Sequence, residues 1–243
     1  MKIQHLLKIV RTTALLIAGV SMNGCAFGGN SASWKEEVLL HDGRTIVVER
    51  SQTDDPSAFR ELGQPDPRKD EIIRFLIPGT NQEVTWKSDF GRGEQDNLSL
   101  LLLDIMGNIP YIATTPRFCH AYNKWGRPNP PYVFFKYERN IWQRIALDEF
   151  PSEFKEANVI IGGYNKHQLK EAERAAPYLS VEVVKKQNRT LTPETQYLRF
   201  ISREPLTIKE AAKVGCEELI YYKGSWISPK GTFGRKYIDR ITK

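Results

Sequence analysis

Two short patterns in the chain contain residue types that act as nucleophiles in enzymes. Cys119 stands directly before His120, and Ser152 precedes Lys155 by three residues, a spacing at which lysine assists proton transfer from serine. Adjacent residues of an extended segment point to opposite faces, so the first pattern does not bring a thiol and an imidazole together. The second pattern consists of two residue types alone. We therefore predict no catalytic residue, and the scattered histidines predict no metal site or cofactor.

Cys25 closes an apolar segment at the start of the chain. Residues 14–23 are mostly apolar and lead into Gly24, and three basic residues come before them, namely Lys2, Lys8 and Arg11. The segment is shorter than the roughly 20 residues that a membrane-spanning helix needs, and its order of basic, apolar and small residues is that of an export signal. We predict a signal peptide over residues 1–24 and a flexible, glycine- and serine-rich tether over residues 25–33.

The end of this segment resembles the lipobox of bacterial lipoproteins, in which a small residue precedes the cysteine that receives diacylglycerol. Gly24 and Cys25 match these two positions, whereas Met22 and Asn23 depart from the usual leucine and small residue. The resemblance implies cleavage before Cys25 and acyl chains, palmitate among them, on its thiol and amino group. Ala26 stands where the family's inner-membrane retention signal has aspartate, so the implied location is the outer membrane, facing the periplasm. An ordinary secretory peptide with a chance cysteine is the alternative.

Composition limits the remaining possibilities. Residues 1–24 carry three basic residues and no acidic one, so their removal lowers the formal net charge from +6 to +3. A nearly neutral chain gives no reason to expect nucleic acid as a partner. The remaining 219 residues, in a chain that is 40% hydrophobic, are enough for one globular domain with a core.

Cys119 and Cys216 are the two cysteines that lipidation would leave over. Two thiols in an oxidising compartment favour a disulfide. The loop closed by such a bond would stabilise the fold by roughly 4 to 5 kcal/mol in the chain-entropy model. Two buried free thiols are the alternative.

Turn residues between apolar runs predict a fold of the α+β class that is mainly β. Residues 34–150 should form an antiparallel meander of about four hairpins. Asp42-Gly43 and Gly107-Asn108 are typical of tight hairpin turns. Leu100 to Leu103 predict an interior strand, with a short helix as the alternative, and residues 51–70 predict a surface loop. A barrel, a sandwich or a propeller-like array would all suit the meander. The four predicted hairpins cover residues 34–48, 72–86, 98–114 and 132–145.

Residues 151–243 predict a mixed α/β section packed on the same domain. Helical patterns occur at residues 166–176, after a Ser180 cap, and at residues 209–214, and a short hairpin is expected near residues 217–227. Residues 159–161 suit one more strand. Residues 197–201 suit a strand or a helix equally, and we leave them undecided.

Aromatic residues gather in two segments that the predicted disulfide would bring together. A proline-rich loop follows Cys119, and a second cluster follows Cys216. Aromatic and guanidinium groups on stiff loops are typical of binding surfaces. A stiff connection between two hairpins is the alternative for the first loop. The candidate binding surface comprises Tyr122, Trp125, Arg127, Tyr132, Tyr222 and Trp226.

Three sequence segments, residues 34–43, 122–132 and 221–226, resemble segments of small uncharacterised proteobacterial lipoproteins. The resemblance implies location and shared architecture but no activity. We therefore expect a lipid-anchored, periplasm-facing binding or envelope-structural module that reaches the membrane through its acyl chains and has an envelope protein or glycan as partner. A partner or inhibitor of a secreted factor is compatible with the same sequence. The alternative is a periplasmic hydrolase with its site between the aromatic loops near Trp125 and Trp226.

Overall fold

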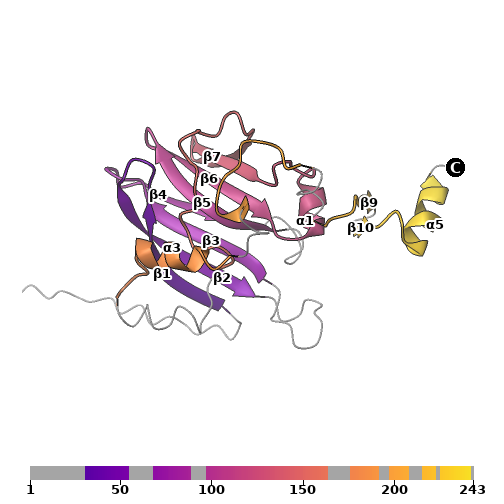
Figure 1. Cartoon of the computed structure of the whole chain (residues 1–243), viewed down its shortest axis with the longest axis horizontal. Coiled ribbons are helices and arrows are strands. Elements are labelled where there is room, and N and C mark those ends of the chain that lie inside the picture. The colour runs from indigo at the N-terminus through magenta and orange to yellow at the C-terminus, as the bar shows by residue number, and fades with distance from the viewer. Residues whose placement is uncertain are drawn as a thin grey trace, which may run out of the picture.

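A computed structural model describes residues 31–54, 68–88, 97–163, 176–191, 197–207, 215–222 and 225–241. Residues 1–24, the predicted lipidation site at Cys25 and the cleavage position at Gly24 lie outside these ranges. The fold is mainly β, as predicted, with two four-stranded antiparallel meanders (Figure 1). The first sheet has the order β1 (Ser31–Leu39), β2 (Thr45–Asp54), β3 (Arg68–Leu76), β4 (Glu83–Lys87). The second has the order β5 (Leu98–Met106), β6 (Ile109–Pro116), β7 (Val133–Glu138), β8 (Ile141–Ile145).

The predicted hairpins are present. The turn at Gly107-Asn108 has the expected backbone, whereas Asp42 does not have positive φ, so the turn at Asp42-Gly43 is not type I′. Gly107 and Asn108 both have positive φ, at 56° and 63°, as a type I′ turn requires. Gly43 has φ 85° in the turn between β1 and β2. Leu100 to Leu103 lie in β5 and not in a helix. These turns are local in sequence, which is why residue types alone predicted them.

Two predicted boundaries are wrong. The tether was expected to end at Ser33, but β1 begins at Ser31, and Ser31 to Ser33 pair with residues 51–53 of β2. The loop expected over residues 51–70 is shorter for a related reason. Its first four residues belong to β2, and its last three, from Arg68, belong to β3. Polar residue types hid these strand ends, because Gln52 and Asp70 are polar and yet buried. Asp70 lies 3.4 Å from the Lys87 ammonium group.

The two sheets share one apolar core, so the meander forms a sandwich. Core residues of the first sheet include Val38, Val48, Phe75 and Trp86. The second sheet contributes residues that alternate along β5 to β7. The core residues of the second sheet are Leu100, Leu103, Ile105, Ile112, Val133 and Phe135.

A bulge in β5 lets one strand serve two cores. The pairing register between β5 and β6 shifts between Leu100 and Leu102. Leu100 and Leu103 face the first sheet, whereas Leu101 and Leu102 face the opposite side. There a second cluster contains Phe150, Phe154, Ala157 and Ile201, which cover the outer face of the second sheet.

The segment after residue 157 crosses between the sheets without forming a strand. The strand expected at residues 159–161 is absent, although Val159 and Ile160 are buried. The Ile160 N–H donates to the Glu36 carboxylate at 3.2 Å, so a side chain takes the place of a strand partner. Leu179 then bridges to Glu36 of β1, and helix α3 (Val181–Asn188) follows.

Helix α3 begins where the sequence predicted it, and Ser180 Oγ accepts from the Val183 N–H. The helices expected at residues 166–176 and 209–214 lie almost wholly outside the described residues, as does the start signal at Thr192. Residues 197–198 form a short 3₁₀ turn, and Phe200 makes an isolated bridge to Glu156, so neither alternative for that segment is fully met.

An ion network is buried on the face of the first sheet that carries the core residues Val38 and Val48. Arg50 Nη1 donates to Glu36 Oε1 at 2.6 Å, and Nη2 donates to Glu71 Oε1. Each of these side chains is at most 2% exposed. Trp34 Nε1 donates to the second Glu36 oxygen at 2.8 Å, and its ring lies 5.0 Å from the Arg50 guanidinium carbon. Burial lowers the pKa of Arg50, but the two carboxylates outweigh that effect and raise it overall, so Arg50 is charged.

Candidate functional site

Helix α1 (Cys119–Lys124) and the loop after it hold the C-terminal part of the chain. Cys119 and Cys216 form the predicted disulfide, with their Cα atoms 5.1 Å apart. Asn123 donates to the Glu217 carbonyl at 3.0 Å and accepts from the Leu219 N–H at 2.9 Å. Arg127 donates to the carbonyls of Glu217 and Cys216 at 2.8 and 2.9 Å. We call this set of bonds the root, because it fixes the chain at residues 216–219.

Helix α1 corrects the expectation that the segment after residue 118 is extended. Arg127 has φ 52° and Gly126 has φ 85°, so the chain reverses immediately after the helix. Arg127 is partly buried, lies 5.0 Å over the Tyr122 ring and points to the root. Cys119 is bonded to Cys216 and is therefore not a nucleophile beside His120.

Two residues of the predicted binding surface are buried. Tyr132 is 3% exposed, and its hydroxyl lies 2.6 Å from the Tyr197 carbonyl and 2.9 Å from the Phe200 carbonyl. Burial raises the pKa of Tyr132 to about 12, so its hydroxyl stays protonated. Tyr122 is also buried, beneath Arg127. Both side chains support the loop, and neither belongs to an exposed surface.

Trp125 is partly buried and packs against the sandwich. Its ring lies 5.9 Å from Phe135, edge to face, and 5.3 Å from the Arg144 guanidinium carbon. Arg144 also donates to the Trp125 carbonyl at 3.0 Å. Trp125 thus closes one end of the core.

The exposed aromatic surface lies on the hairpin of β9 (Ile220–Tyr222) and β10 (Ser225–Ile227). Tyr221 and Trp226 are directly opposite across the two strands, so their rings share a face and lie 5.1 Å apart. Tyr221 is 61% exposed, and Trp226 is partly exposed. Tyr222 was the predicted member, but successive strand residues alternate between faces, so Tyr221 is the partner of Trp226. The alternation in Ile-Tyr-Tyr could have indicated this.

Helix α5 (Thr232–Ile241) completes a unit with this hairpin, which we call the arm, residues 219–241. The arm lies beyond α1 and away from both sheets (Figure 1). Gly234 packs onto the hairpin so closely that a Cβ there would lie 1.8 Å from the Ser228 carbonyl oxygen. Glycine is therefore required at this contact. Helix α5 was not predicted, because Thr-Phe-Gly is a weak helix signal.

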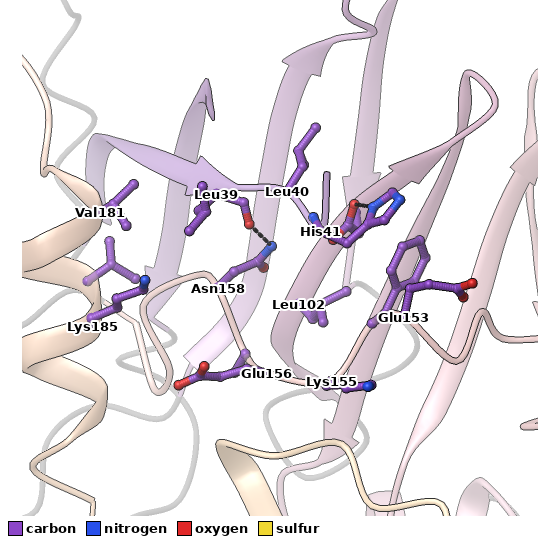
Figure 2. Close-up of a pocket in the computed structure, with 14 residues that line it drawn as sticks. Leu39, Leu40, His41, Leu102, Glu153, Lys155, Glu156, Asn158, Val181 and Lys185 are labelled. Carbon is purple, nitrogen blue, oxygen red and sulfur yellow. Dashed lines mark hydrogen bonds and ion pairs between the residues drawn. The ribbon is translucent and has the colours of Figure 1, made fainter. Parts of the chain in front are cut away.

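A separate pocket of about 180 Å³ lies where β1 meets β5 (Figure 2). His41 Nδ1 lies 2.7 Å from Asp104 Oδ1, and the His41 N–H donates to Asp104 Oδ2 at 2.9 Å. The Asp104 side chain is 4% exposed and that of His41 is 20% exposed. Burial raises the pKa of Asp104, although its hydrogen bonds to His41 and Ile105 act in the opposite direction.

The pocket contains a histidine that is held by a buried carboxylate. Asp104 orients the His41 ring, which leaves Nε2 as the nitrogen available to a ligand or water. The described residues that line the pocket include no serine, threonine, tyrosine or cysteine, so His41 has no hydroxyl or thiol there to activate. Its volume is below the about 300 Å³ at which typical ligand pockets begin. The Asn158 amide donates to the Leu39 carbonyl at 3.0 Å (Figure 2). It also donates to the Leu103 carbonyl at 2.8 Å, so it joins backbone groups of both sheets.

The comparisons with known proteins give no relative. No family model matches the chain, and no curated protein and no solved structure matches it. No helix in the described part of the chain is long and apolar enough to cross a membrane. Within the same ranges, no three His, Cys, Asp or Glu side chains gather as a metal site would need.

Proposed function

We propose that the protein is a lipid-anchored, periplasm-facing module of the cell envelope, held at the outer membrane through Cys25, that binds its ligand with the arm. The observation that carries the binding role is the Tyr221–Trp226 ring pair, exposed on a hairpin whose root is fixed to the sandwich. A fixed aromatic pair loses little conformational entropy on binding, which is why such residues dominate binding energy at interfaces.

The anchor rests on the sequence of residues 1–25. Replacing Cys25 with Ser removes the thiol that would carry diacylglycerol, so the variant should leave the membrane fraction and appear in the soluble periplasm. Mass spectrometry of the purified wild-type protein should show an acylated Cys25 at the amino terminus. An unmodified amino terminus, or continued membrane association of Cys25→Ser at high salt, would contradict the anchor.

The binding role is tested with a photo-crosslinking amino acid in intact cells. We expect adducts when it replaces Tyr221. Ile141 on β8 is the matched control, because it is 56% exposed and lies outside the arm, where we expect no adduct. Equal crosslinking at the two positions would mean that exposure, and not the arm, determines contact.

The His41–Asp104 pair favours a hydrolase as the second candidate, at a place other than the aromatic loops. If this candidate is correct, the wild-type protein hydrolyses esters or phosphoesters of p-nitrophenol. His41→Gln should then lower the rate of hydrolysis at least about 100-fold, because a general base contributes at least that factor. Equal rates for the two proteins would leave the pair a structural contact between the sheets.

A further inference from the structure

Positive charge is concentrated in the arm. Residues 219–243, which are the arm and the two residues after it, contain six basic residues and one acidic residue, whereas the chain from Cys25 onward has a formal net charge of only +3. The part between Cys25 and residue 218 is therefore slightly acidic. A basic segment attached to an acidic body indicates a partner with negative charge.

The basic side chains of the arm lie in solvent. Lys230, Arg235, Lys236 and Arg240 are all exposed. Lys236 and Arg240 are four residues apart on α5 and so lie on one side of the helix. Gly234 contacts the hairpin from another side, where a Cβ would meet Ser228. Gly234 thus faces the turn at Ser228, which follows β10, while Lys236 and Arg240 lie on another side of the helix and are exposed.

Aromatic residues accompany this charge. Tyr221 is exposed and Trp226 is partly exposed on the hairpin that carries α5. Tyrosine and tryptophan favour the boundary between lipid headgroups and hydrocarbon, because one end of each side chain is apolar and the other is polar. Basic residues in the same segment of the chain favour an anionic surface.

The tether limits how far the sandwich can stand from a bilayer. Between Cys25 and Ser31, the start of β1, the chain spans at most about 20 Å when fully extended. A protein lipidated at Cys25 therefore keeps its folded part close to the headgroups. An anionic lipid surface is then within reach of the protein at all times.

We infer that the ligand of the arm is the anionic surface of a phospholipid bilayer, which Lys236, Arg240 and the Tyr221–Trp226 pair contact. This inference rests on the proposed function and names the partner of the same arm. The contact is peripheral: cationic side chains approach the lipid phosphates while the two rings lie at headgroup depth. It would give the lipidated protein a second membrane contact and so one preferred orientation.

Vesicle binding by the chain from residue 25 to residue 243 carrying Cys25→Ser tests the inference, because this form has neither the apolar leader nor an acyl chain. We expect it to partition onto vesicles of phosphatidylglycerol mixed with phosphatidylcholine, to prefer them to pure phosphatidylcholine, and to dissociate as salt rises. Each basic residue at an anionic surface changes partitioning about fivefold, so Lys236→Gln with Arg240→Gln should weaken it about 25-fold.

Lys35→Gln with Arg74→Gln is the matched control, since these residues are about half exposed on the first sheet and lie outside the arm. The control should bind anionic vesicles as the Cys25→Ser protein does. Equal binding to neutral vesicles, or the same loss in both double variants, would overturn the inference. Adducts to a protein at Tyr221 with no vesicle binding would also overturn it and leave the proposed binding role intact.

Discussion

Removing the disulfide should destabilise the sandwich through the unfolded chain. Cys119 and Cys216 are 97 positions apart, and the loop between them contains β7, β8, α3 and the buried Phe150 and Phe154. In the chain-entropy model, closing a loop of that length lowers the entropy of the unfolded state by an amount equivalent to about 4.7 kcal/mol at 25 °C. The double variant Cys119→Ala/Cys216→Ala should lose that much unfolding free energy. A single domain has only about 5–15 kcal/mol in total.

Urea denaturation at equilibrium measures this loss. Wild-type protein with a reducing agent should unfold at the same urea concentration as the double variant, and the reducing agent should not affect the double variant. These two comparisons separate the cross-link from the volume of the cysteine side chains. A difference of less than about 1 kcal/mol would refute the reasoning, because it would mean that the unfolded chain is already as restricted without the bond.

Three further predictions concern buried polar groups. Arg50→Met should lower the unfolding free energy by about 3–5 kcal/mol, because it leaves two buried carboxylates without their cation. Lys35→Ala, which breaks an exposed ion pair, should lower it by at most about 1 kcal/mol. Urea denaturation measures both changes. Asp104 has a pKa above its unfolded value, so its contribution to stability is present below about pH 4 and is lost as pH rises through the folded pKa. The difference in unfolding free energy between wild type and Asp104→Asn should therefore change over that pH window and be constant above it. Tyr132→Phe should cost about 1–3 kcal/mol in thermal or urea unfolding, since it removes a buried hydroxyl bonded to two carbonyls.

Local turn chemistry explains why the hairpins could be predicted. Gly107-Asn108 reverses the chain with positive φ at both residues, a conformation that few other residue pairs adopt, and Asp42-Gly43 does so with positive φ at Gly43 alone. Four sequence positions were therefore enough to indicate two turns. The division into two sheets was not accessible in this way. It depends on which apolar faces meet, and on the bulge that turns Leu101 and Leu102 to one side of β5.

The buried ion network shows where polarity misleads. Arg50 and Glu71 are charged and flank a segment read as a loop, yet both lie in strands and are almost fully buried. Their burial depends on a contact between three strands and on Trp34, which no short window of sequence reveals. Desolvation by the surrounding core is compensated only when all partners are in place.

The candidate site was predicted in outline and corrected in its residues. The expectation of export predicted the disulfide between Cys119 and Cys216 correctly, because two thiols in an oxidising compartment favour a bond. Aromatic content alone could not separate Tyr132, which supports a loop, from Tyr221, which is exposed. Strand alternation separates Tyr221 from Tyr222, but it requires knowing where β9 begins.

Two weak contacts on one bilayer act differently from either one alone. The arm of a protein lipidated at Cys25 meets the membrane as an intramolecular partner, at the effective concentration set by a short tether. Low affinity of the isolated arm is then enough for the arm to be bound most of the time. The root becomes the decisive element, because Asn123, Arg127 and the disulfide transmit the position of the arm to the sandwich. Breaking the root would leave lipidation and arm affinity unchanged, and it would remove only the fixed orientation of the sandwich above the bilayer.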